Sequence, residues 1–176
     1  MNAEATPIQV LILIGSDSDL PVMAPAGDLL RDLGITCEIT VASAHRSPGR
    51  VERLLADAPG RGVKVFIVGA GAAAHLAGMV AAHTTSPVIG VPIDSSALKG
   101  LDALLSTVQM PPGVPVATVS IGKPGATNAA VLAAQILAVS DPELAARLVA
   151  YKGKLADAVE QAAARINQQR AVGSGK

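Results

Sequence analysis

Short apolar runs recur along this chain, most of them ending at glycine, serine or proline. Four runs rich in β-branched residues predict buried strands at 8–14, 63–68, 87–93 and 114–121, and a fifth at 36–42 alternates more. Because the first four are almost continuously apolar, we expect helices to cover both faces of their sheet, as in a parallel arrangement.

Segments with helical spacing fill the intervals between these runs, at 20–33, 48–58, 73–82, 96–108 and 126–139. The first begins after Asp19 as a plausible N-cap, carries Pro21 in its first turn and stops at Gly34. This alternation is the βαβ signature of an α/β fold with a parallel sheet. In such folds ligands bind at the carboxyl ends of the strands.

The last segment, 142–170, alternates charged residues with leucine, valine and isoleucine. It predicts one long or broken amphipathic helix, with Gly153 as the point where it could break. At this length we expect one domain over 1–176, with a core at about 8–140 and a helical extension at about 141–170.

Composition narrows the class of protein. The net charge is zero and only Phe66 and Tyr151 are aromatic, which argues against nucleic-acid binding. No run reaches the roughly 18 apolar residues of a membrane span, and the start of the chain lacks the basic region of a secretory signal. With the lone Cys37 interpreted as a buried structural thiol, we expect a cytoplasmic protein. A mean hydropathy of +0.45 suggests that apolar surface is buried between subunits of a homo-oligomer.

The first predicted strand runs into the loop GSDSD at 15–19. Free N–H groups at the start of a helix, together with the hydroxyls of Ser16 and Ser18, suit a phosphate. The alternative is that Asp17 and Asp19 only cap the helix.

The predicted strand at 36–42 is followed by SAHRSP at 43–48. The His45 imidazole can exchange a proton near neutral pH, and Arg46 offers a planar fork for phosphate or carboxylate. The alternative is a solvated surface loop, but its place at a strand end favours function.

The third loop, GAGAAAHLAGM at 69–79, is built almost entirely of small residues. These allow close approach of a ligand or of another chain, although tight helix packing explains the alanines better. His75 could be catalytic, but we favour a core histidine bonded to a carbonyl, and His83 a partner for the end of a helix. No metal-binding, P-loop or dinucleotide-binding pattern occurs, so we expect no metal and no cofactor.

Five motifs occur in order over about residues 8–140: GSDSD, SAHRSP, GAGAAAHLAGM, STVQMPPGVPVATV at 106–119 and NAAVLAAQIL at 128–137. Together they resemble the class I N5-carboxyaminoimidazole ribonucleotide mutases of purine biosynthesis, and the class II enzymes, which carboxylate aminoimidazole ribonucleotide directly, look less similar. The resemblance implies an isomerase without a cofactor. It also implies a three-layer α/β/α sandwich with a flavodoxin-like parallel sheet, plus a C-terminal helix, assembled as a homo-octamer with active sites at subunit contacts.

The resemblance also implies roles for residues of these loops. His45 would be the catalytic acid and base, and substrate contacts would come from Ser16, Asp19, Arg46, Ser18, Ser43, Gly71, Ala72 and His75. Phosphate would meet the hydroxyls and Arg46, and ribose would meet Asp19, whereas Asp17 has no assigned role. Three positions depart from the family pattern: Ala72 replaces glycine, Ala77 replaces proline and Asp94 replaces glutamine. If residue 72 needs positive φ, its methyl could crowd the pocket.

Two other functions are compatible with the same fold. A non-catalytic nucleotide sensor would need no His45, and a direct carboxylase would use the uncarboxylated nucleotide with CO₂.

Overall fold

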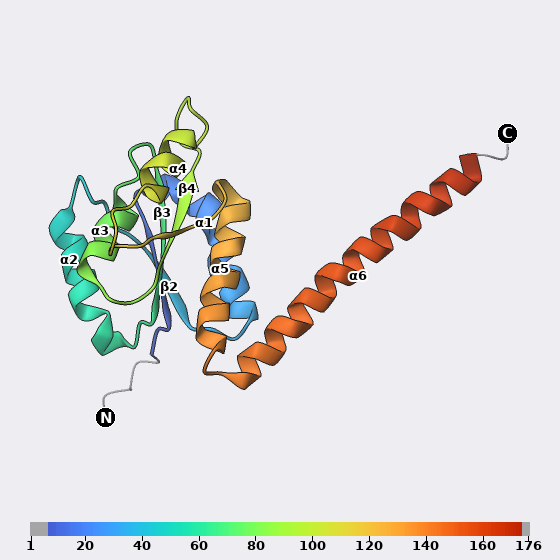
Figure 1. The fold of residues 1–176 in the computed structure, drawn as a ribbon, viewed down its shortest axis with the longest axis horizontal. Helices are drawn as coiled ribbons and strands as arrows, with labels where there is room; N and C mark the ends of the chain where they lie inside the picture. The colour runs from blue at the N-terminus through green and yellow to red at the C-terminus, as the bar shows by residue number, and fades with distance from the viewer. Residues whose placement is uncertain (1–6, 174–176) are drawn as a thin grey trace.

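A five-stranded parallel sheet in the order β2-β1-β3-β4-β5 forms the centre of the molecule (Figure 1). The computed structural model describes residues 7–173. The strands are β1 (Val10–Ile14), β2 (Cys37–Val41), β3 (Val65–Gly71), β4 (Val88–Ile93) and β5 (Ala117–Thr118). This order is that of a flavodoxin-like α/β fold, as expected.

Helices cover both faces of the sheet, so that the fold has three layers. The α-helices are α1 (Leu20–Asp32), α2 (Pro48–Asp57), α3 (Leu76–His83), α4 (Leu101–Val108), α5 (Gly122–Ala138) and α6 (Pro142–Gly173), and the short 3₁₀ turns are η1 (Asp17–Asp19) and η2 (Pro59–Arg61). Helices α1 and α5 pack on one face, and α2, α3 and α4 on the other.

The pleat of β1 explains why its sequence is continuously apolar. All five residues of Val10–Ile14 are buried. Val10, Ile12 and Ile14 face α1 and α5, whereas Leu11 and Leu13 face α2 and α3, because successive side chains of a strand point to opposite faces. Continuous apolar character therefore marks a strand that is buried on both sides, as expected from the sequence.

The strand order creates the place where a ligand can enter. The chain passes from β1 to β2 on one side, and then from β2 to β3 on the other side of β1. The loops after β1 and β3 consequently leave toward opposite faces, and a crevice opens between them at the carboxyl edge of the sheet.

Three predicted elements are shorter than the sequence suggested. Helix α3 begins at Leu76 instead of residue 73, because Ala72 and Ala74 have positive φ angles of 51° and 43°. Helix α4 begins at Leu101, after Gly100 with a φ of 85°, instead of at residue 96. Strand β5 has only two residues, because it lies at the sheet edge and pairs with β4 alone.

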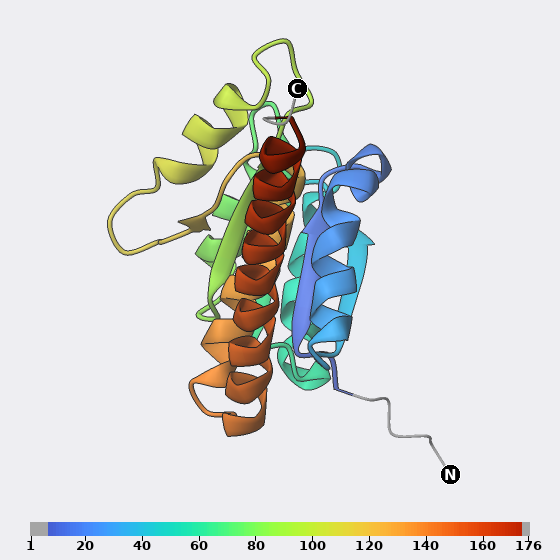
Figure 2. The ribbon, with the colours of Figure 1, turned by 90° about the vertical axis from the view of Figure 1, so that its right-hand side faces the viewer.

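Helix α6 continues through Gly153 without the break that glycine could have caused. Only its first turns pack on the body of the protein, where Leu144 is buried and Leu148 and Tyr151 are partly buried. The remainder projects away from the sheet as an isolated rod (Figure 1), and it points toward the viewer in Figure 2. Among the described helices, none combines the length and the apolar character needed to cross a bilayer.

The backbone at Ala72 predicts an unusual response to glycine. The left-handed conformation is unfavourable for an L-residue by roughly 1–2 kcal/mol, so Ala72→Gly should raise the free energy of unfolding by about 1 kcal/mol. Ala73→Gly, beside it in the same turn, is the matched control and should lower that free energy, because Ala73 has no positive φ. Urea denaturation of both variants checks this, and a loss of stability at residue 72 would contradict it.

Candidate functional site

A cavity of about 300 Å³ lies at the carboxyl edge of the sheet, where the loops after β1, β2, β3 and β4 meet. The residues in its lining are Gly15, Ser16, Ser18, Asp19, Ser43, Ala44, His45, Arg46, Ala70, Gly71, Ala74, His75, Leu76 and Ser95. Every residue that the resemblance assigns to catalysis or substrate contact is among them except Ala72. The fold thus brings together residues that lie far apart along the chain, from Gly15 to Ser95.

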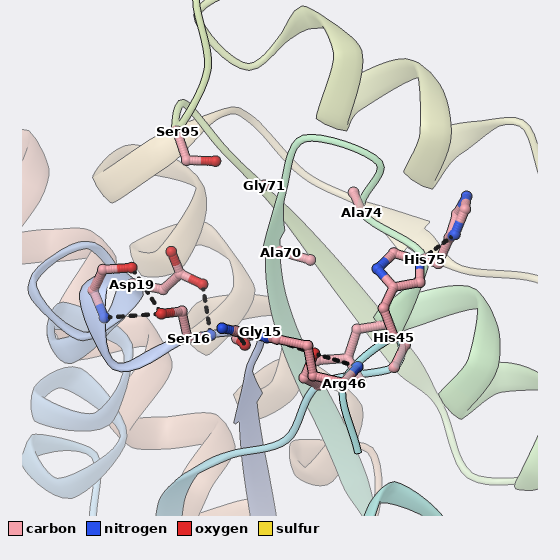
Figure 3. A pocket seen from close by; sticks show the side chains of 14 residues that line it. Gly15, Ser16, Asp19, His45, Arg46, Ala70, Gly71, Ala74, His75 and Ser95 are labelled. Carbon is pink, nitrogen blue, oxygen red and sulfur yellow. Dashed lines mark hydrogen bonds between the residues drawn. The ribbon is translucent and has the colours of Figure 1, made fainter. Parts of the chain in front are cut away.

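The first loop forms a capping box around Ser16 and Asp19 (Figure 3). The Ser16 N–H donates to Asp19 Oδ2 over 3.1 Å, and Ser16 Oγ accepts from the hydroxyl and the N–H of Ser18. Asp17, which sequence analysis left without a role, accepts from Ser16 Oγ and from the Ser18 N–H. The loop is therefore both self-capped and open to the cavity, so capping does not exclude binding.

Asp19 carries a carboxyl group whose charged form is disfavoured by burial. The residue is only 6% exposed, and this burial raises the pKa of its carboxyl above the usual value. The Ser16 N–H and the charge of Arg46 oppose the shift. Asp19 occupies the N-cap position of α1, as predicted, but its side chain makes no capping bond to that helix. Within residues 7–173 its Oδ1 forms no hydrogen bond, and the residue lines the cavity.

Arg46 ties the second loop to the first. Its Nη2 donates to the carbonyl of Gly15 over 2.7 Å, and its Nε donates to Ser43 Oγ over 3.3 Å. The Arg46 N–H also donates to Ser43 Oγ, which closes a tight turn before α2. Since a guanidinium carries five N–H donors, several remain for an anion in the cavity.

His45 and His75 form a pair at the cavity wall (Figure 3). His45 Nε2 lies 2.6 Å from His75 Nδ1, and the rings meet edge to face. His75 is exposed, so our preference for a core histidine bonded to a carbonyl was wrong. Of the two facing nitrogens, one must donate and the other accept, so a single proton occupies this contact.

The loops after β3 and β4 form another wall of the cavity. A side chain at Gly71 would collide with the Ser95 hydroxyl, because a Cβ there would lie 1.8 Å from Oγ. Ser95 was missed by sequence analysis, although it follows the end of β4 and the rule of strand ends could have found it. Ala72 is exposed and outside the lining, so its methyl strains the backbone without crowding the cavity.

Other candidates from the sequence lie away from the cavity. Cys37 is partly buried, its thiol donates to the Gly27 carbonyl, and burial raises its pKa. His83 ends α3 and its Nδ1 lies 2.8 Å from the Met79 carbonyl, as expected for a histidine at a helix end. Within residues 7–173, no three His, Cys, Asp or Glu side chains gather as metal ligands would.

Comparison with known proteins gives consistent matches over most of the chain. The family model described as AIR carboxylase matches residues 9–158. A Thermotoga maritima protein named N5-carboxyaminoimidazole ribonucleotide mutase is 52% identical over 91% of this chain and 92% of its own length. A Bacillus subtilis protein of the same name is 57% identical over 78% of this chain and 85% of its own length.

Solved structures agree with the fold. The crystal structure of Treponema denticola PurE covers 87% of this chain and 94% of its own, with a TM-score of 0.79 and 30% identity. The crystal structure of a variant of Treponema denticola PurE2 covers 89% of this chain and 96% of its own, with a TM-score of 0.81 and 28% identity.

Because Asp19 is buried, we expect Asp19→Asn to raise the melting temperature by an amount that depends on pH. Because the folded-state pKa is raised, the wild-type protein loses stability as pH rises through the range between the unfolded and folded pKa values. Asn keeps an acceptor for the Ser16 N–H without the buried charge, so the variant should melt at a higher temperature at pH 7. The gain should shrink as pH falls and vanish below about pH 3, where Asp19 is protonated in both the folded and the unfolded state.

Thermal melts at several pH values measure this gain. The matched control, Asp17→Asn, alters an exposed carboxyl in the same loop and should give no comparable gain at pH 7. A pH-independent difference for Asp19→Asn would contradict the assignment to its charge.

Proposed function

The chain belongs to the AIR carboxylase family, and from that membership we propose that it is an N5-carboxyaminoimidazole ribonucleotide mutase of de novo purine biosynthesis. This isomerase moves the carboxylate from N5 to C4 of the imidazole ribonucleotide. One observation carries the proposal: the His45–His75 pair opens on the same cavity as the serine and arginine loops that suit a nucleotide phosphate.

The reaction balances without a cofactor. The substrate is a carbamate, which releases CO₂ once N5 takes up a proton. The resulting aminoimidazole is an enamine whose C4 attacks CO₂, and C4 then gives up its proton. One proton enters at N5 and one leaves at C4, so a single group can first donate and then accept it.

His45 fits this double role, and His75 orients it. With Nε2 held at 2.6 Å from His75, the Nδ1 of His45 has no partner within residues 7–173 and is left for the substrate. An imidazole ionises near neutral pH, which suits both halves of the cycle. His75 sets which nitrogen of His45 carries the proton, as the third member of a catalytic triad does for its histidine.

The rest of the cavity supports binding and confinement. The hydroxyls of Ser16 and Ser18 can turn from their partners within the loop toward the phosphate, to which Ser43 and Arg46 offer further donors. The partly free carboxylate of Asp19 suits the ribose hydroxyls, which are donors. The small residues Ala70 and Gly71 at the end of β3 leave room to retain CO₂ until C4 attacks.

Replacement of His45 tests the mechanism. His45→Asn should lower kcat by at least about 10²-fold, the typical contribution of general acid–base catalysis, and should leave nucleotide binding intact. The matched control is His83→Asn, at the far end of α3, which should keep normal turnover. Near-normal turnover in the His45 variant, measured by formation of the C4-carboxylated product, would refute its role.

One assay separates the mutase from the two other functions. The protein is supplied with the N5-carboxylated nucleotide, and separately with the uncarboxylated nucleotide and bicarbonate. Efficient use of only the first supports the mutase, efficient use of the second supports direct carboxylation, and binding without turnover supports a sensor.

Self-association is the second part of the proposal. Along α6, Leu155, Val159 and Ile166 are 52%, 66% and 56% exposed, and their spacing places them on one helical face. Leu101, Leu105 and Val108 are likewise exposed on one face of α4. A cytoplasmic homo-octamer, in which residues 141–170 of each chain act as an arm on its neighbours, would bury such surfaces.

The apolar stripe of α6 can be tested by substitution. A Leu155→Gln, Val159→Gln, Ile166→Gln variant should dissociate to smaller species, because glutamine keeps helix propensity while removing apolar contact. The matched control, Asp157→Gln with Glu160→Gln, alters the opposite face and should stay octameric. Multi-angle light scattering measures the mass, and a monomeric wild-type protein at micromolar concentration would contradict the assembly.

A further inference from the structure

A second hollow, of about 630 Å³, adjoins the cavity and shares Ser16, Ser43 and Arg46 with it. It lies between the end of β2 and the start of α2, and its lining adds Asp17, Thr40, Val41, Ser47 and Arg50. The proposed function uses the shared residues for the substrate phosphate and assigns nothing to the remainder.

Arg50 is held in place by uncharged acceptors. Its Nε donates to the Val41 carbonyl over 2.8 Å, and its Nη2 donates to Thr40 Oγ1 over 3.0 Å. Among residues 7–173, neither Arg46 nor Arg50 forms an ion pair with a carboxylate. The two bonds therefore orient the Arg50 guanidinium while leaving its charge uncompensated and its other N–H groups open to the hollow.

The electrostatic balance of the hollow favours an anion. Its ionisable lining consists of two guanidinium groups and one carboxylate, that of Asp17. Asp17 Oδ1 already accepts from the Ser18 N–H and from Ser16 Oγ, so part of its charge is met within its own loop. The N-terminus of α2 adds the positive end of its dipole, and the Ser47 side chain makes no capping bond there.

We propose that Arg50 is a second phosphate-binding residue, which together with Arg46 holds the 5′-phosphate of the ribonucleotide where this hollow meets the cavity. The proposal rests on the proposed function for the identity of the nucleotide. Two planar forks on one phosphate can share its three terminal oxygens, an arrangement that selects a dianionic monoester over an uncharged alcohol. Arg50 would thus discriminate the ribonucleotide from its dephosphorylated riboside.

Binding measurements on matched ligands test this role. The dissociation constants of 5-aminoimidazole ribonucleotide and of 5-aminoimidazole riboside are determined calorimetrically for the wild-type protein and for Arg50→Gln. We expect the variant to bind the ribonucleotide at least about tenfold more weakly, the loss typical of a hydrogen bond to a charged group, and the riboside unchanged. The dissociation constant of Arg50→Lys for the ribonucleotide should lie between those of the wild-type protein and Arg50→Gln, because lysine keeps the charge but loses the planar fork.

The matched control is Arg53→Gln, on the exposed surface of the same helix and outside the hollow, which should change neither constant. Equal weakening of both ligands by Arg50→Gln would show that Arg50 only supports the loop, and an unchanged ribonucleotide constant would place the phosphate elsewhere. Either result overturns the proposal. If the wild-type protein prefers the ribonucleotide but does not convert its N5-carboxylated form, the mutase function fails while the test of Arg50 stands.

Discussion

A parallel sheet buried on both faces sends the carboxyl ends of its strands to one edge, and the whole site depends on this constraint. The hydrogen bonds of β1 to β2 and β3 set the register of that edge. Apolar side chains on both sides of β1, β3 and β4 keep the sheet in place. The residues that line the cavity therefore lie at or just after the ends of the strands, where a rigid core positions them.

At that edge, groups of opposite electrostatic character lie close together. Burial disfavours the charge of Asp19, whereas Arg46 carries a charge that no carboxylate among the described residues neutralises in an ion pair. A sugar phosphate suits both, because it offers hydroxyl donors at one end and an anion at the other. The His45–His75 contact lies in the same cavity and adds a group that can transfer a proton.

Helix α6 differs from the core in that most of its apolar side chains are exposed. Its first turns pack through Leu144, but its outer turns expose apolar side chains that no element within residues 7–173 covers. An isolated amphipathic rod is a poor arrangement for one chain alone and a good one for an assembly, because the exposed stripe gains stability only from a neighbour.

Much of the fold was determined by the sequence alone, because burial on both faces leaves a local signature. The run at 8–14 predicted β1, and the loops that follow β1 and β2 were identified from their residues. Element boundaries near Ala72 and Lys99 were not predictable, since positive φ at a non-glycine residue is imposed by surrounding contacts. The pairing of His45 with His75, 30 residues apart, was decided only by the tertiary structure, because hydrogen bonds between distant loops depend on how the strands align. The same reason hid Ser95 and Arg50: their residue types are ordinary, and only their positions beside the cavity and the adjoining hollow distinguish them.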